Sequence, residues 1–319
     1  MSLPGYNGGS LEKFIDDVVR PPSGFLADLH GAVDIIVRRL HLLPGNSVQK
    51  IVQTGSLGKG TAVQQSCDAD LVLFLNGYDS MEEFLTRRQR ILADIEKWLQ
   101  QPADQITRMT IKRRTQYNLT YNCEVRYRGK TVKLEMDILP AIDVFRSKSG
   151  GERPIRQVYE EMKSKPENVR SNYSVSFCEK QKAIFRSENS KVKDLIRLLK
   201  YWKMKNSRSE WKLSSYCCEV IGVYVYCEKL NKKTNFKMID GFRLALEMLS
   251  KFDNKRLTFS NYYDPNETEW VNLFPMTATY IMDPANPFSN TGPRENEIRK
   301  IKRCAAETLA SLPQFQYTF

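Results

Sequence analysis

The sequence predicts an α+β protein with two lobes, a mixed-sheet lobe followed by a mainly helical one. Before about residue 150, segments with helical spacing of apolar residues alternate with short strand-like runs. After residue 178 the spacing is almost entirely helical, and proline and polar residues occupy much of the segment between, at 147–173. We therefore expect lobes at residues 1–154 and 155–319, with the functional site in a cleft between them.

The first lobe is expected to combine helices with a mixed β-sheet. The first helix should end at Pro21 and the second at Pro44, because proline lacks the N–H that a helix interior needs. The run LVLFL contains no polar residue, so it predicts a buried strand. In chain order we expect helices at 11–20 and 25–43, strands at 48–53 and 71–75, a helix at 80–101, and strands at 115–129 and 130–141.

The second lobe is expected to contain three helices, each with apolar residues at helical spacing. The middle one is apolar on every side and includes two adjacent cysteines, which fits a buried helix in which cysteine acts as a small apolar filler. The three helices are expected at 192–205, 214–230 and 240–252.

The composition indicates a folded, basic protein. Of its 319 residues 41% are hydrophobic, and the formal net charge is +12. Such an excess of positive charge predicts attraction to nucleic acids, to nucleotides or to an acidic membrane face. No apolar run is long enough to span a bilayer, and the start of the chain lacks a signal-peptide pattern. The seven cysteines are scattered without a CxxC pair, so we expect reduced thiols and a cytoplasmic location.

The glycine-rich stretch GSLGKGT, at residues 55–61, does not fit the phosphate-binding loop GxxxxGK[ST]. Gln53 stands where that loop needs its first glycine, and Gly60 stands where it needs serine or threonine. A Gly-Ser turn can still hold phosphate. Gly55 lets the backbone approach an anion closely, and Ser56 offers a hydroxyl and an amide donor.

Two aspartates follow this turn at the start of the apolar strand. Because side chains two residues apart on a strand share a face, Asp68 and Asp70 should project to the same spot. Either aspartate could instead cap a helix or a turn. Near the end of the sheet lobe, apolar residues alternate with Lys133, Glu135 and Asp137. If that strand lies beside the first, Asp137 completes a cluster of three carboxylates, which is typical of a Mg²⁺ site with substrate phosphates.

Together these features describe the site of the DNA-polymerase-β-like nucleotidyltransferases, and the sequence resembles one branch, the 2′-5′-oligoadenylate synthetases, relatives of cyclic GMP-AMP synthase. The matching segments are GSLGKGT, CDADLVLFL, LEMDILPAIDV, KVKDLIRLLKYW, SSYCCE and IMDPANP, spread between Gly55 and Pro287. The resemblance implies a two-lobed nucleotidyltransferase fold with its active site in the cleft. It also implies template-independent polymerisation of ATP into 2′-5′-linked oligoadenylates, with release of pyrophosphate.

The resemblance assigns roles to individual residues. Asp68, Asp70 and Asp137 would be the catalytic carboxylates and would hold two Mg²⁺ ions. Many members carry glutamine where this chain has Ser215, which leaves strictness for adenine open. The residues assigned to ATP are Gly55 and Ser56 at the donor triphosphate, Lys200 at the donor phosphates, and Ser215 and Tyr216 near the donor base.

Double-stranded RNA is the activator that the resemblance implies, bound along a basic face opposite the active cleft, as in an innate antiviral sensor. The segment 180–212 is dense in lysine and arginine, although such a run on a helix can also be a solvated face. By similarity, the RNA contacts would be Lys59, Lys182, Arg186 and Ser190. Nothing in the sequence indicates a membrane anchor or an obligate protein partner.

Two alternatives remain open from the sequence. One is a cyclic-dinucleotide synthase that uses the same carboxylates, although the zinc-binding insertion of cyclic GMP-AMP synthase is not apparent. The other is a non-catalytic sensor that binds double-stranded RNA, which the presence of all three aspartates disfavours. The sequence leaves open the product length, the linkage and the oligomeric state, because the choice of attacking hydroxyl depends on small shifts in position.

Overall fold

The computed structural model describes residues 3–64, 68–147, 150–207, 210–253, 256–259 and 279–312. The chain divides into two compact units that interleave along the sequence. The sheet unit comprises Pro21–Lys59 and Ser66–Ala183, and the helical unit comprises Met1–Arg20, Gly60–Gln65 and Ile184–Phe319. The boundary after residue 154 stays a prediction. No helix in the described ranges is long and apolar enough to cross a membrane.

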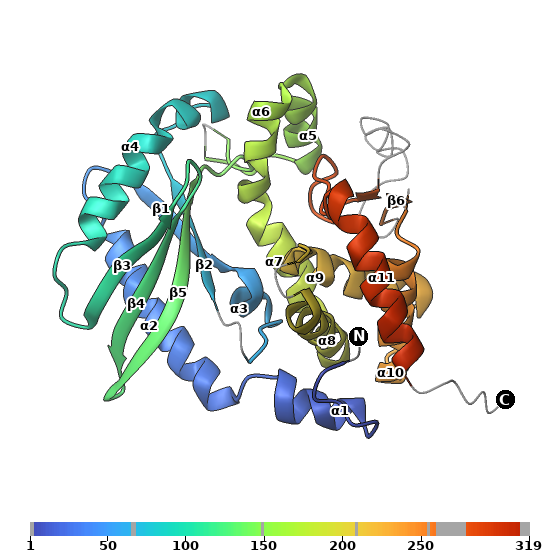
Figure 1. Cartoon of the computed structure of the whole chain (residues 1–319). Coiled ribbons are helices and arrows are strands. Elements are labelled where there is room, and N and C mark those ends of the chain that lie inside the picture. Colours follow the sequence, from blue (N-terminus) through green and yellow to red (C-terminus); the bar gives the residue numbers. More distant parts are fainter. Residues whose placement is uncertain are drawn as a thin grey trace. The chain divides into compact units, whose positions relative to one another are not determined.

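A five-stranded mixed sheet forms the centre of the sheet unit, in the order β1-β2-β5-β4-β3 (Figure 1). β2 and β5 pair in parallel, whereas the other neighbouring strands pair antiparallel, as expected for the mixed sheet. The strands are β1 (Val48–Thr54), β2 (Ala69–Leu75), β3 (Ile106–Arg114), β4 (Leu119–Tyr127) and β5 (Lys130–Ala141).

Two long helices, α2 (Ser23–His41) and α4 (Met81–Leu99), cover one face of this sheet (Figure 1). Helix α2 approaches the sheet closely, since a Cβ on Gly31 would lie 2.1 Å from the Tyr127 ring. Along β4 and β5, buried side chains on the covered face alternate with half-buried or exposed ones on the other, with exceptions such as Thr120, which is buried on the second face. We call this second face, which carries Asp137, the open face.

Shorter elements complete the sheet unit. The glycine-rich stretch is a single helical turn between β1 and β2, and four helical segments follow β5. The last of these contains the point at which the chain passes from one unit to the other. The elements are α3 (Gly55–Lys59), α5 (Ile155–Ser164), α6 (Glu167–Arg170), the 3₁₀ helix η2 (Ser171–Phe177) and α7 (Cys178–Ser187).

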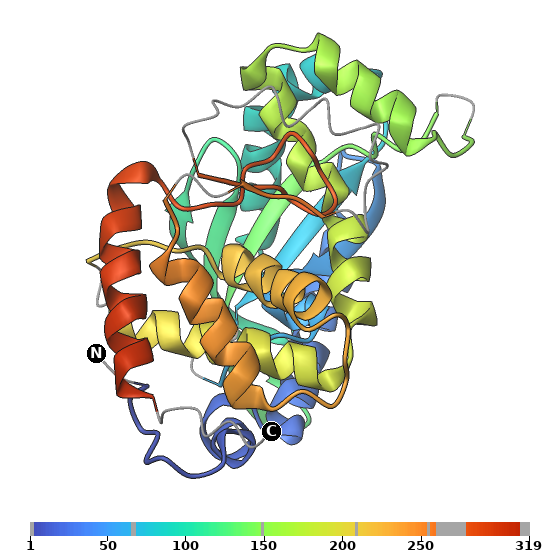
Figure 2. The same ribbon diagram turned by 90° about the vertical axis from the view of Figure 1, so that its right-hand side faces the viewer.

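The helical unit is organised around α8 (Ser190–Ser207), whose Trp202 is fully buried. α9, α10 and α11 pack around the same apolar core, and Figure 2 shows these helices crossing one another. The remaining elements are α1 (Leu11–Phe14), the π-helix η1 (Ile15–Val19), α9 (Ser215–Tyr224), the π-helix η3 (Val225–Lys229), α10 (Met238–Ser250), β6 (Arg256–Leu257), β7 (Tyr280–Ile281) and α11 (Glu295–Ser311).

Several elements of the structure were not predicted from the sequence, among them β3, α5, α7 and α11. β3 was not predicted because irregularities in its pairing, at Ile106–Arg108 and Ile111–Arg113, break the alternation of apolar and polar side chains. Helix α11 was also missed, although its buried residues recur at helical spacing. The predicted helix at 214–230 is a regular helix up to Tyr224 and a π-helical turn thereafter.

Candidate active site

Asp70 and Asp137 are direct neighbours in the parallel pairing of β2 with β5. Residues paired in this way project to the same face of a sheet, so both side chains lie on the open face. Asp68 lies two residues before Asp70, immediately before β2, and by alternation points to the same side. The predicted adjacency of the two strands is therefore confirmed.

Asp137 is held by two donors from β4 that the sequence reading did not single out. Asn118 Nδ2 donates to Asp137 Oδ1 over 3.1 Å, and Thr120 Oγ1 donates a short hydrogen bond to the same oxygen. Thr120 lies directly opposite Asp137 in the antiparallel register and is 2% exposed. Knowledge of the hairpin register would have identified it. Both donors are neutral, so they orient the carboxyl group without placing a positive charge beside it.

Gly55 is required by its contact with Asp70. Its φ of +59° lies in the left-handed region that glycine favours, and an added Cβ would stand 1.6 Å from Asp70 Oδ2. The absence of a side chain thus lets the first residue of α3 and the Asp70 carboxylate share one small space. The two halves of the GSLGKGT…DAD motif are in direct contact within the sheet unit.

The carboxyl of Asp68 lies in a negative environment. Neighbouring atoms desolvate this carboxyl even though the residue is exposed overall, and Glu135 and Asp137 add repulsion, so the pKa of Asp68 is raised. Lys112 opposes the shift, because its positive charge favours the ionised form of Asp68; the same ammonium also forms an ion pair with Glu135. Such mutual repulsion is what a bound cation would relieve.

The donor chemistry of this face suits a hard cation, because carboxylate oxygens from adjacent strands share one face. Among the described residues, however, no three histidine, cysteine, aspartate or glutamate side chains are close enough together to hold a metal ion. The residue types fit Mg²⁺, while the spacing in this structure is that of separate carboxylates. The predicted three-aspartate site therefore stays a prediction.

Lys200, predicted at the donor phosphates, is buried in the helical unit. Its Nζ lies 2.5 Å from Glu219 Oε1 on α9 and 3.0 Å from Thr61 Oγ1, and Thr61 donates to the same glutamate oxygen over 2.6 Å. Lys200 is 5% exposed and Glu219 is 2% exposed. The ammonium is therefore neutralised inside the unit, which the motif LLKYW gave no means of predicting.

Tyr216 is anchored by the motif IMDPANP. Its hydroxyl lies 2.9 Å from Asp283 Oδ1, and its ring packs edge-on against Phe185. Burial and the Asp283 carboxylate raise the pKa of the tyrosine well above its usual value. Ser215 is exposed next to it and accepts a hydrogen bond from Lys203 Nζ over 2.9 Å. The side chain that departs from the family pattern is thus engaged by a lysine on α8.

The predicted RNA contacts differ in exposure. Arg186 near the end of α7 and Ser190 at the start of α8 are exposed, and Lys182 is partly buried. Lys59 is 6% exposed, so its side chain is not displayed on the surface in this structure. The exposed pair lies in the helical unit, where Asn189 Oδ1 between them accepts from the Val192 amide.

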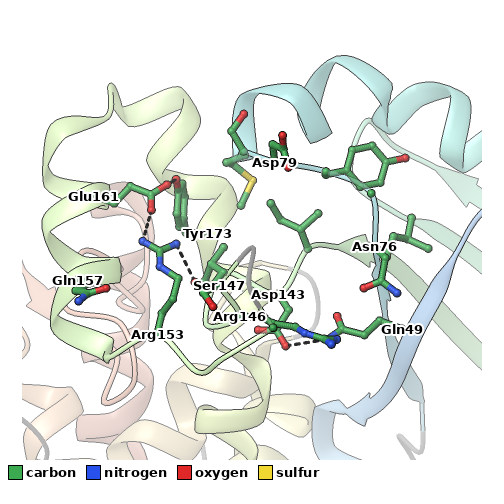
Figure 3. Close-up of a pocket in the computed structure, with 18 residues that line it drawn as sticks. Gln49, Asn76, Asp79, Asp143, Arg146, Ser147, Arg153, Gln157, Glu161 and Tyr173 are labelled. Atoms are coloured by element: carbon green, nitrogen blue, oxygen red, sulfur yellow. Dashed lines mark hydrogen bonds and ion pairs between the residues drawn. The ribbon is translucent and has the colours of Figure 1, made fainter.

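A polar cavity of about 560 Å³ lies at the end of β2, lined among others by Asp79 and Asp143 (Figure 3). Leu75, the last residue of β2, lines it, whereas Asp70 is the second residue of that strand, about 16 Å away at strand spacing. Several of its charged side chains are already paired. Arg153 bonds Glu161 over 2.6 Å, and Asp143 accepts from Lys50 over 2.9 Å. This cavity is therefore separate from the carboxylates of the open face.

Comparison with known families supports the reading of both halves of the chain. Residues 152–318 match the family described as 2′-5′-oligoadenylate synthetase 1, domain 2, C-terminus, and residues 34–128 match the nucleotidyltransferase domain. The mouse 2′-5′-oligoadenylate synthase 1A is 30% identical over 312 residues, covering 91% of this chain and 83% of the relative. The rat 2′-5′-oligoadenylate synthase 1A is 28% identical, covering 88% and 83%.

Solved structures agree on the fold. An Escherichia coli CdnC structure with ATP superimposes with a TM-score of 0.60 at 19% identity, covering 95% of this chain and 90% of that one. Terminal uridylyl transferase 4 from Trypanosoma brucei with bound dUTP gives 0.60 at 13% identity, covering 95% and 97%. With the carboxylates of the open face and the family match over more than half of its length, the chain is a nucleotidyltransferase that belongs to the 2′-5′-oligoadenylate synthetase family.

Proposed function

We propose that the protein joins ATP molecules into 2′-5′-linked oligoadenylates without a template. The main support for the proposal is the position of Asp70 opposite Asp137 on the neighbouring strands β2 and β5. Two neutral donors hold the Asp137 side chain. In each step the 2′-hydroxyl oxygen of an acceptor bonds to the α-phosphorus of a donor ATP. The bond from that phosphorus to the β-phosphate oxygen breaks, the hydroxyl loses its proton, and pyrophosphate leaves.

Asp68, Asp70 and Asp137 are the proposed holders of two Mg²⁺ ions, since nucleotidyltransferases typically need a divalent metal. When bound, such ions lower the pKa of the attacking hydroxyl and neutralise charge on the leaving pyrophosphate. Within the described residues Asp137 Oδ2 accepts no hydrogen bond, whereas Oδ1 accepts two. Asn118 and Thr120 therefore fix the rotamer of Asp137 and leave its second oxygen available.

The proposed ATP contacts are Gly55 and Ser56 in the sheet unit and Lys200, Ser215 and Tyr216 in the helical unit. Lys200 can reach a phosphate only if its ammonium is released from Glu219, so donor binding and this ion pair compete. The Ser215 hydroxyl and the neighbouring Lys203 form a polar pair beside Tyr216, where other members carry glutamine. Tolerance of bases other than adenine is an expected consequence.

Activation by double-stranded RNA is part of the proposal and fits the family, with Arg186 and Ser190 as the exposed contacts. Lys182 and Lys59 are assigned with them, but Lys59 would have to become exposed before it could bind phosphate. A cytoplasmic site of action, in which the six described cysteines stay reduced and buried, completes the proposal.

The proposal is tested by incubating the protein with ATP and Mg²⁺, with and without long double-stranded RNA. Products are resolved by chromatography and digested with a nuclease specific for 3′-5′ bonds. The expected result is that linear oligomers resistant to this nuclease form only when RNA is present. Resistant oligomers without RNA would remove RNA as the activator. Cyclic products would move the protein to the cyclic-dinucleotide synthases, and the absence of product would leave an RNA-binding protein.

A further inference from the structure

Basic side chains continue across the open face from the rung that carries the aspartates. Pairing places Arg113, Thr120, Asp137 and Asp70 in one row across β3, β4, β5 and β2. Arg114, the next residue on β3, bonds Glu96 of α4 on the covered side, so alternation directs Arg113 to the open side. Two strand spacings of about 4.8 Å separate the backbones of Arg113 and Asp137, a gap that an arginine side chain can largely bridge.

Further rungs carry more arginines away from the site. In the strand register, Arg108 on β3 lies opposite Glu124 on β4, and Glu124 lies opposite Lys133 on β5. Arg126 on β4 lies opposite Thr131 on β5. Lys133 is four residues from Asp137 along β5, about 13 Å at strand spacing, and Thr131 is about 20 Å away. We call Arg108, Lys112, Arg113, Arg126 and Lys133 the basic row; all five are exposed.

The lysines and the arginines of the basic row differ in their partners. Lys112 pairs with Glu135, and Lys133 lies 3.5 Å from Glu124. In the described part of the chain, Arg108, Arg113 and Arg126 have no carboxylate partner. Three guanidinium groups are therefore left to face solvent or a ligand, although Glu124 lies opposite Arg108 in the strand register.

Protection of an edge strand explains part of this charge but not all of it. Charged residues on β3 discourage pairing with another chain, because β3 is an outer strand of the sheet. Arg126, however, is on β4, which has β3 and β5 on either side. Its charge does not protect an edge, which favours a ligand for the row.

We propose that the basic row binds the already formed part of the oligoadenylate while its terminal 2′-hydroxyl is at Asp137. Guanidinium groups pair well with phosphodiester oxygens, and the three unpaired arginines lie at increasing distances along the strand that carries Asp137. The row thus retains an acceptor of several nucleotides between additions. This inference rests on the proposed function and names the residues that set product length.

The direct test is binding of a fluorescent 2′-5′-linked adenylate tetramer in Mg²⁺ without ATP. The triple variant Arg108→Gln, Arg113→Gln, Arg126→Gln should bind the tetramer about tenfold more weakly, with a shallower dependence on salt. In the ATP reaction its ratio of longer products to dimers should fall. Arg90→Gln is the matched control, because Arg90 is an exposed arginine on α4, the helix that covers the opposite face.

Three outcomes would overturn the inference, and a fourth would place the failure in the proposed function. Unchanged tetramer affinity and product ratio in the triple variant would overturn it, as would an equal loss in Arg90→Gln. Loss of double-stranded RNA affinity without loss of tetramer affinity would overturn it in favour of an RNA surface. If the unmodified protein forms no oligoadenylate, the proposed function itself fails; if it does and the ratio is insensitive to the row, only this inference fails.

Discussion

A charged side chain of the proposed site can be compared between the two units, Asp137 in the sheet unit and Lys200 in the helical unit, and the two are held in opposite ways. In the sheet unit, Asp137 is half-buried and receives hydrogen bonds from the neutral side chains of Asn118 and Thr120. In the helical unit, the Lys200 ammonium is buried against the Glu219 carboxylate. The first arrangement orients a charge and leaves it available to a cation. The second cancels a charge, and so stabilises the unit while withholding the lysine from a phosphate.

The largest effect on activity is expected from Asp137→Asn, which tests whether the charge of Asp137 is available to a cation. The amide keeps the shape of the side chain but removes the negative charge, so oligoadenylate synthesis should fall by about a thousandfold or more. The unfolding temperature should change little, because the donors at Oδ1 can still bond an amide oxygen. The rate of pyrophosphate release and a thermal melt measure the two quantities. Retention of more than a tenth of the activity would show that Asp137 is not a metal ligand.

The next largest effect is expected on stability, from Glu219→Ala. This change leaves the Lys200 ammonium buried without its carboxylate, which costs about 3–5 kcal/mol of unfolding free energy. Urea unfolding followed by fluorescence measures it. The double variant Glu219→Ala, Lys200→Met is the control and should recover much of the loss, because it removes the uncompensated charge. A loss of under 1 kcal/mol in the single variant would mean that water solvates the lysine.

Gly55→Ala should affect activity more than stability. The new Cβ would collide with the Asp70 carboxylate. Asp70 can avoid the collision only by shifting from its position opposite Asp137 on the neighbouring strand. A fall of about 10- to 100-fold in ATP polymerisation is expected, with about 1 kcal/mol of backbone strain. Gly60→Ala is the matched control, since Gly60 also has positive φ, at +75°, but nothing lies within 4 Å of an added Cβ. Equal activity losses in the two variants would implicate strain alone.

The smallest effect is expected from Thr120→Val, which removes one of the two donors to Asp137 in a side chain of the same shape. Asn118 still orients the carboxylate, so activity should fall about 3- to 10-fold, with a higher Mg²⁺ concentration needed for half-maximal rate. Thr120→Ser keeps the hydroxyl and should restore the Mg²⁺ dependence. If serine and valine behave alike, Thr120 acts through packing and does not orient Asp137.

The sequence could predict those parts of the site that lie on regular strands. Alternation placed Asp68, Asp70 and Asp137 on one side of their strands, and the pairing of β2 with β5 confirms that Asp70 and Asp137 are neighbours. It could not predict the polar partners, because the contact of Lys200 with Glu219 and Thr61 joins segments far apart in the chain. Because the pairing of β3 is irregular, the sequence predicted neither that strand nor the face of the sheet on which Arg113 lies.

The turn between β4 and β5 has a consequence for the order in which the sheet unit folds. Arg128 and Gly129 both have positive φ, +49° and +74°, which is the backbone of a two-residue type I′ hairpin. This hairpin alone brings Thr120 and Asn118 to Asp137 through local contacts, which form quickly. The neighbouring Asp70 arrives only through parallel pairing with a distant strand, which is slow. During refolding, recovery of circular dichroism should therefore precede recovery of catalysis, since the last strand to dock completes the set of carboxylates.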